Sequence, residues 1–229
     1  CPFLNKAMVN VHGGDMYVVE GRYPEAVDAF GEGDEAFVAI APGHPFRLAG
    51  ATLLALELVT GGTPPDAVVH PASHGETLVG LQRGFGLAVE AGLADDMPSL
   101  YAVQPEDCAP IVDALADGDA EHTPVEHPDT IVGPLEVPDP AAGRAAIGAL
   151  NPTDGNAVAV SDRDILQGAV DGCEMGPEVG ATGGTAIAGV RALAADGAFE
   201  AADDVVLVNP VAGSKEADLL RSHLMSQGM

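Results

Sequence analysis

The sequence predicts an α/β protein in which a parallel or mixed sheet is covered by helices on both faces, in three layers. Apolar runs typical of buried strands alternate with segments of helical periodicity along almost the whole chain of 229 residues. The clearest unit is PDAVVHPASHGETLVGLQRGFGLAVE, residues 65–90, which predicts a buried strand, a tight loop and a helix with an apolar stripe. Hydrophobic residues make up 47% of the chain, which is too many for a disordered acidic polypeptide.

The first third of the chain predicts three helices and three strands. A short helix over 4–11 ends at Gly13 and Gly14, where a left-handed cap is sterically free. Pro24 opens the next helix, because proline fits the first turn. We expect helices at 4–11, 24–30 and 47–60, and strands at 16–20, 37–41 and 67–70.

The remaining elements follow from the same periodicities. A loop at 71–76 leads into the helix whose stripe is Leu78, Leu81, Phe85 and Val89. Ser161, with Asp164 three residues later, predicts a helix start after the strand at 157–160. We expect further strands at 100–104, 157–160 and 204–208, and helices at 108–115, 144–150, 182–195 and 215–225, with an acidic, proline-rich loop at 117–140 that holds one strand at 130–132.

The charge balance is strongly acidic, with 35 Asp and Glu against 9 Lys and Arg and a net charge of −26. Such a surface repels nucleic-acid phosphates and anionic lipid headgroups, so we expect neither a nucleic acid nor a membrane as a partner. Concentrated salt screens the repulsion between carboxylates, so the composition indicates a salt-adapted, halophile-type cytoplasmic protein. Three widely spaced cysteines make a disulfide framework or a zinc site improbable.

The loop between the strand and helix of residues 65–90 is the first candidate site. A helix that begins directly after a strand points unpaired backbone N–H groups and its positive dipole end beyond the sheet, where they favour an anion. Gly75 is the only glycine in this turn. The alternative is an ordinary connection in which Ser73 or Thr77 caps the helix.

Two further groups of residues have chemical potential. Arg47 follows the turn APGHPF, and its guanidinium can grip a phosphate in a two-pronged fork or lie on the surface as an ordinary arginine. The acidic loop contains metal-ligand residue types between prolines, and a solvated loop explains them better, so we expect no metal. The members of this group are Glu121, His122, Glu126, His127 and Asp129.

In order along the chain, these segments resemble threonine synthase and its relatives among the fold-type-II, or tryptophan synthase β-like, pyridoxal-phosphate enzymes. The segments that carry the resemblance are AIAPGHPFRLAG, PPDAVVHPASHGETLVGLQRGFGLAVEAGL and AVQPEDCAPIVDAL. The most specific parts are PDAVVHP and QPEDCAPIV, which stand at the spacing of the family. The resemblance covers most of the chain, including PEVGATGGTAIAGVRAL and VVLVNPVAGSK near its end.

The resemblance implies a lyase that uses pyridoxal 5'-phosphate to convert O-phosphohomoserine into threonine and phosphate, in threonine biosynthesis. It implies that Arg47 binds the phosphate of this amino-acid substrate. It also implies that the loop after the strand holds the cofactor phosphate and that a residue near the last strand meets the pyridine nitrogen. The cofactor-binding residues are then Ser73, His74, Gly75, Glu76, Thr77 and Asn209.

The sequence departs from the family pattern at several of these positions. Glu76 would bring a carboxylate next to a phosphate, which is unfavourable. Asn209 has no hydroxyl. The family's lysine belongs to a Ser-Phe-Lys-Asp segment that this chain does not contain, so we expect no catalytic residue for the covalent step here. The only lysines are Lys6 and Lys215.

We therefore expect the carboxyl-terminal portion of a threonine-synthase-like enzyme, incomplete at its amino end. Residues 1–40 would be the remnant of a small mobile α/β domain, and residues 41–229 the large α/β domain. Two alternatives stay open: a non-catalytic or divergent paralogue that binds a small anionic metabolite, and another pyridoxal-phosphate lyase that acts on serine or cysteine derivatives. The sequence leaves the oligomeric state open, with a homodimer as one alternative.

Overall fold

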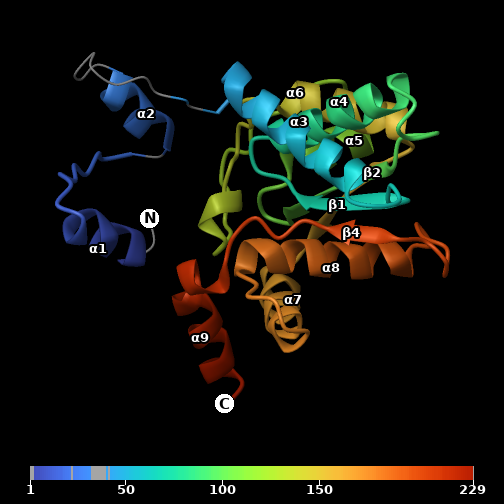
Figure 1. Ribbon diagram of the computed structural model, residues 1–229. Helices are drawn as coiled ribbons and strands as arrows, with labels where there is room; N and C mark the ends of the chain where they lie inside the picture. The colour runs from blue at the N-terminus through green and yellow to red at the C-terminus, as the bar shows by residue number, and fades with distance from the viewer. Residues whose placement is uncertain (1–2, 22, 32–39, 41, 229) are drawn as a thin grey trace.

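A computed structural model describes residues 3–21, 23–31, 40 and 42–228 of the chain. Four strands form one sheet in the order β3-β2-β1-β4, and all three neighbouring pairs are parallel. The predicted parallel sheet with helices on both faces is confirmed (Figure 1). The strands are β1 (Ala67–Pro71), β2 (Ser99–Pro105), β3 (Asn156–Val160) and β4 (Val205–Leu207).

Helices cover the sheet in two layers (Figure 1). On one face lie α3 (Pro45–Thr60), α4 (Glu76–Glu90), α5 (Pro110–Asp117) and α6 (Gly143–Leu150). On the other face lie α7 (Asp162–Glu174) and α8 (Ala181–Ala195). Alternate residues of β1 point into the two cores, since Val68 packs with Leu78, Leu81 and Phe85, whereas Val69 packs with Ile165 and Leu193.

Short glycine-lined contacts bring the helices of each layer together. A Cβ atom added to Gly84 of α4 would lie 2.5 Å from the carbonyl oxygen of Thr52 and 2.6 Å from Cβ of Ala55, both on α3. In the other layer, a Cβ at Gly168 of α7 would lie 2.6 Å from the carbonyl oxygen of Gly184 on α8. Glycine is therefore needed at both places for close helix packing.

The strand order defines where the site lies. The chain builds β1, β2 and β3 outward in one direction and then returns to add β4 on the other side of β1. In sheets of this kind, ligands bind beyond the carboxyl ends of the strands where the order reverses. Here that position is between β1 and β4, so the loops after Pro71 and after Leu207 flank it.

The remaining helices surround this core or lie apart from it (Figure 1). Helices α1 (Phe3–Val11) and α2 (Tyr23–Gly31) lie to one side of the sheet, and α9 (Ala217–Ser226) lies near α7. Three short 3-10 turns complete the fold, at Gly133–Leu135, Asn151–Thr153 and Gly213–Lys215. No helix in the described residues has both the length and the apolar character needed to cross a membrane.

Two predicted strands are absent from the described residues. The strand predicted at 16–20 is wrong, because no neighbouring strand pairs with it and Tyr17 and Val18 are exposed. The strand predicted at 130–132 is also wrong, since the Asp162 carboxylate takes the hydrogen bonds of this segment. It accepts from Thr130 Oγ1 at 2.6 Å and from the Ile131 N–H at 2.8 Å.

The strand predicted at 37–41 lies outside the described residues, apart from Ile40, which is not in a strand. The division into a small domain at 1–40 and a large one at 41–229 stays a prediction. The capping signal at Ser161 is confirmed: its Oγ accepts from the Asp164 N–H at 3.2 Å, at the start of α7.

Large apolar side chains are exposed mainly in the first quarter of the described chain. The described residues include fifteen exposed large hydrophobic residues, and ten of these lie from Met8 to Leu53. Tyr17 is 87% exposed, Val18 81% and Phe46 71%. The first turns of α3 and the segment before α2 therefore carry apolar surface that the described residues do not cover.

Candidate functional site

The loop after β1 is held firmly on both sides. The Ala72 N–H donates to the Val103 carbonyl at 2.8 Å, and the Ala142 N–H donates to the His74 carbonyl at 2.9 Å. Gly75 is the N-cap of α4 with a φ of +87°, a left-handed conformation that favours glycine. A Cβ atom there would lie 2.7 Å from Cβ of Ala146, so both the backbone and the neighbouring α6 require glycine at this position.

The start of α4 presents backbone donors without a side-chain cap. The N–H groups of Gly75, Glu76, Thr77 and Leu78 donate no hydrogen bond within the described part of the chain. Four open N–H groups are usual at a helix start, but here the cap residue is glycine and supplies no acceptor. The predicted alternative, a cap by Ser73 or Thr77, is therefore wrong.

The Glu76 side chain turns to α3 and forms an ion pair. Its carboxylate accepts from Arg47 Nε at 3.1 and 3.2 Å and lies 3.1 Å from Arg47 Nη2. It also accepts a short hydrogen bond from the Gly43 N–H, in a turn where Gly43 has a φ of +87°. The Glu76 side chain is 7% exposed and that of Arg47 45%, so the carboxylate is buried and the guanidinium partly faces solvent.

His74 lies beside this pair at the edge of the loop. Its Nδ1 accepts from the Ala141 N–H at 3.4 Å. Burial lowers the pKa of His74, and the Arg47 charge lowers it further, while Glu76 and Asp139 act in the opposite direction. The lowered pKa favours a neutral ring near pH 7, in keeping with an Nδ1 that accepts a hydrogen bond.

The predicted residues fall into two places. Arg47 and Ser73–Thr77 come together at the start of α4. Asn209 lies instead at the start of α8, where its Nδ2 donates to the Glu178 carbonyl at 3.0 Å and its Oδ1 leaves no room for a side chain at Gly183. No hydrogen bond joins Asn209 to the loop at 73–77 within the described residues.

Sequence reasoning missed two residues that shape this edge. Gln104, completely buried, donates from Nε2 to the Ala72 carbonyl at 3.3 Å, and its Oε1 accepts from the Ile111 and Val112 N–H groups at 2.9 and 3.3 Å. It therefore ties the loop after β1 to the start of α5. The second is Gly43, whose glycine-proline context marks a turn but does not reveal its contact with Glu76.

Two members of the acidic group, Glu121 and His122, pair with neighbouring side chains. Arg144 Nη1 lies 2.7 Å from Glu121 Oε1, and His122 Nε2 lies 2.9 Å from Asp139 Oδ1. The described residues contain no group of three or more His, Cys, Asp or Glu that could share a metal ion.

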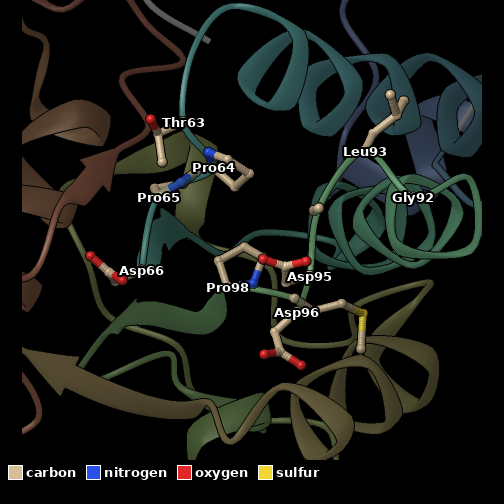
Figure 2. A pocket seen from close by; sticks show the side chains of 11 residues that line it. Thr63, Pro64, Pro65, Asp66, Gly92, Leu93, Asp95, Asp96 and Pro98 are labelled. Carbon is tan, nitrogen blue, oxygen red and sulfur yellow. The ribbon is translucent and has the colours of Figure 1, made fainter.

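A hollow of about 420 Å³ lies at the opposite edge of the sheet (Figure 2). Asp66 and Pro98 line it, and they directly precede β1 and β2, so it lies at the amino ends of these strands. Asp95 and Asp96 add carboxylates. Because ligands of such sheets bind at the carboxyl ends, we place the candidate site at the start of α4 and not here.

A parallel sheet with its open helix start at the reversal of strand order is compatible with several cofactor-binding families, and comparison with known proteins decides between them. The family model described as "Pyridoxal-phosphate dependent enzyme" matches residues 1–211. The chain belongs to this family. Pyridoxal 5'-phosphate is the family's cofactor, as the resemblance in the sequence implied.

Curated relatives of this pyridoxal-phosphate family member include archaeal threonine synthases. The protein from Methanosarcina acetivorans is 25% identical over 207 residues, which cover 88% of this chain and 51% of the relative. The protein from Methanocaldococcus jannaschii is 24% identical over 217 residues, covering 93% and 54%. The chain thus spans about half the length of the curated relatives it matches.

Solved structures of fold-type-II enzymes share the fold. Threonine deaminase isoform 2 from Solanum lycopersicum superimposes with a TM-score of 0.79 at 18% identity, over all of this chain and 61% of that one. An L-serine ammonia-lyase from Rhizomucor miehei gives 0.78 at 19% identity, over 96% and 70%. At these identities the likeness shows the architecture alone.

The described residues match the family's cofactor only in part. The open N–H groups at the start of α4 suit a phosphate, but the buried Glu76 carboxylate next to them does not. Lys6 lies on α1 and Lys215 in the 3-10 turn before α9, and both side chains are exposed. The chain thus supplies backbone donors for the cofactor phosphate but not the lysine of the family's Ser-Phe-Lys-Asp segment, and we derive no reaction step through the cofactor.

Proposed function

We propose that the chain is part of a pyridoxal-phosphate-dependent lyase that removes a leaving group from the side chain of an amino acid. The observation that carries this proposal is the loop after β1, where α4 begins at the reversal of strand order with a left-handed glycine and with four N–H groups that have no acceptor among the described residues. Such a helix start stabilises a phosphate through its dipole and its donors.

The first candidate reaction is that of threonine synthase, in which O-phosphohomoserine and water give threonine and phosphate. It is supported by the similarity to threonine synthases, which extends over 88% and 93% of the chain for the two archaeal relatives. In this reading Arg47 would bind the substrate phosphate, as a guanidinium does well.

A second candidate is a lyase of serine or cysteine derivatives that carry no phosphate. The observation that favours it is the ion pair between Arg47 and the buried Glu76 carboxylate. A guanidinium that already binds a carboxylate has fewer donors left for a substrate phosphate.

Absorption spectroscopy with pyridoxal 5'-phosphate tests the cofactor proposal. We expect the 229-residue chain to show no borohydride-sensitive band of covalently held cofactor, because it lacks the family's Ser-Phe-Lys-Asp segment. We expect a longer protein that contains this sequence together with the family's lysine segment to show the band. A band from the chain alone would contradict our placement of the lysine.

Activity measurements on that longer protein then separate the candidates. Release of phosphate from O-phospho-L-homoserine with formation of threonine supports the first, and keto-acid formation from L-serine or L-cysteine derivatives supports the second. A longer protein that shows neither band nor turnover is the non-catalytic paralogue, and the lyase proposal is then wrong.

A further inference from the structure

The Glu76 carboxylate lies where an external anion would have to bind in order to use Arg47. It accepts hydrogen bonds from Arg47 Nε and from the Gly43 N–H, and it is within 3.1 Å of Arg47 Nη2. These donors come from the turn before α3 and from the first turn of α3, two elements that the carboxylate joins to α4. A carboxylate in a fork of this kind is a strong internal ligand for the guanidinium.

Burial makes this arrangement selective. Glu76 is 6% exposed, so its charge is shielded from solvent and acts strongly on any neighbouring anion. A second anion at Arg47 would have to displace the carboxylate and leave it buried without its partner, which is costly. The pair therefore favours a substrate that brings no negative charge to this point.

A second buried carboxylate in the same chain acts in a comparable way. Glu216, 4% exposed, accepts from the Thr182 N–H at 2.9 Å and from Thr182 Oγ1 at 2.7 Å, in the first turn of α8. Glu216 is thus an internal anion at a helix start, where a dipole favours negative charge. Both helix starts at this edge are accompanied by a buried glutamate.

We propose that Glu76 determines the substrate class of this site. Its carboxylate is the internal counter-ion of Arg47, and it restricts the enzyme to amino-acid substrates whose leaving group is not a phosphate. The inference rests on the proposed lyase function and decides between its two candidates. Glu76 is a specificity-determining residue here, and Arg47 is its positioning partner.

Calorimetric titration of the 229-residue chain with inorganic phosphate, at constant salt concentration, tests the inference. We expect the wild-type chain to bind phosphate very weakly. We expect Glu76→Gln, which keeps the shape of the side chain but removes its charge, to bind phosphate about 10- to 100-fold more tightly, the range of a few charge-assisted hydrogen bonds. The double variant Glu76→Gln, Arg47→Gln should lose this gain.

Glu90→Gln is the matched control, because Glu90 is exposed at the other end of α4 and its replacement changes the net charge by the same amount. Equal phosphate affinity in wild type and Glu76→Gln, for variants that are shown by circular dichroism to be folded, would overturn the inference. A gain that persists without Arg47 would also overturn it, since the phosphate would then bind the N–H groups of α4 alone.

The inference and the proposed function fail separately. Phosphate titration measures anion binding to the 229-residue chain, and the Arg47→Gln variant isolates the part that depends on Arg47, whereas the cofactor band and turnover are measured on the longer protein. In that protein Glu76→Gln should gain phosphate release from O-phospho-L-homoserine relative to wild type. If the longer protein shows the band and wild type already releases this phosphate through Arg47, the lyase function stands and the inference is wrong.

Discussion

Single side chains hold the edge of the sheet at the candidate site, and Gln104 shows how. Cap residue Ala109 has no side-chain acceptor for the start of α5. The Gln104 side chain, at the end of β2, accepts instead from the backbone N–H groups of Ile111 and Val112. Its amide nitrogen simultaneously fixes Ala72, which precedes the loop of the site. The glutamine of the segment QPEDCAPIV is thus explained by its hydrogen bonds to the backbone.

His70 gives the first prediction at this scale, on the pH dependence of stability. Burial lowers its pKa to about 4, and its Nδ1 has no hydrogen-bond partner in the described part of the chain. Above about pH 6.5 the ring is neutral in both the folded and the unfolded chain. As the pH falls from about 6.5 to about 4, only the unfolded chain takes up the proton, so the free energy of unfolding decreases, by about 3 kcal/mol in total.

We therefore expect the unfolding free energy of His70→Gln to depend less steeply on pH between 6.5 and 4 than that of wild type. The difference in slope corresponds to the uptake of up to about one proton fewer on unfolding. Urea unfolding at several pH values measures this slope. His127→Gln, at an exposed histidine, is the control and should keep the wild-type slope. If His70→Gln and His127→Gln give the same slope, His70 is protonated in the folded chain at these pH values.

The residue scale also shows what the sequence could not reveal about the site. The sequence predicts that Arg47 and the loop at 73–77 take part in one site, and the structure brings Arg47 next to Glu76. It does not reveal that the two side chains bind each other, because this contact depends on the turn at Gly43 and on the packing of α3 against α4. The family resemblance implies that Asn209 meets the cofactor, whereas in the structure its Nδ2 donates to the Glu178 carbonyl, just before α8.

At the scale of elements, the close contact between α3 and α4 depends on glycines in the middle of a helix. A Cβ at Gly80 would overlap Cβ of Ala51, and one at Gly84 would lie 2.6 Å from Cβ of Ala55. Alanine is the better helix former, by about 1 kcal/mol, so only tertiary packing can make it unfavourable here. The two helices would have to separate, with loss of core contacts around Phe85.

We expect Gly84→Ala to lower the unfolding free energy by about 1–3 kcal/mol, the usual cost of overpacking. Gly86→Ala in the same helix should instead be neutral or stabilising by up to about 1 kcal/mol, because its Cβ would meet only Met97 Sδ at 3.9 Å. Chemical denaturation of both variants measures the difference. Equal effects of the two substitutions would show that α3 can move away from α4 at little cost.

Elements with their own packing partners were predictable from periodicity, and those without were not. The stripe from Leu78 to Phe85 predicts α4 because the same residues form the core. The apolar run at 16–20 has the composition of a strand, but a strand also needs a neighbour, which local sequence does not specify. At 130–132 the decisive partner is Asp162, which lies 32 residues after Thr130 in the chain.

At the scale of the whole molecule, the net charge of −26 governs stability. Mutual repulsion between exposed carboxylates opposes folding, and salt reduces it as the screening length shortens to roughly 3 Å at 1 M. We expect the melting temperature to rise by at least about 5 °C between 0.2 M and 2 M KCl, which corresponds to about 2 kcal/mol for a chain of this size.

A variant with four neutralised surface carboxylates separates charge screening from a general effect of salt on apolar burial. The substitutions Asp95→Asn, Asp96→Asn, Asp117→Asn and Asp119→Asn are all at exposed positions. This variant should melt at a higher temperature than wild type in 0.2 M KCl and gain less from added salt. An identical gain in both proteins would assign the effect to apolar burial instead.

The apolar surface between Met8 and Leu53 limits how far salt can help. Ions that screen the repulsion between carboxylates also make water a poorer solvent for the exposed side chains of Tyr17, Val18 and Phe46. When salt screens its charges, the protein loses the electrostatic repulsion that keeps these side chains away from those of another copy. At high salt, the rise in melting temperature is therefore accompanied by aggregation. The contacts between copies start from the amino-terminal quarter, while the sheet stays folded.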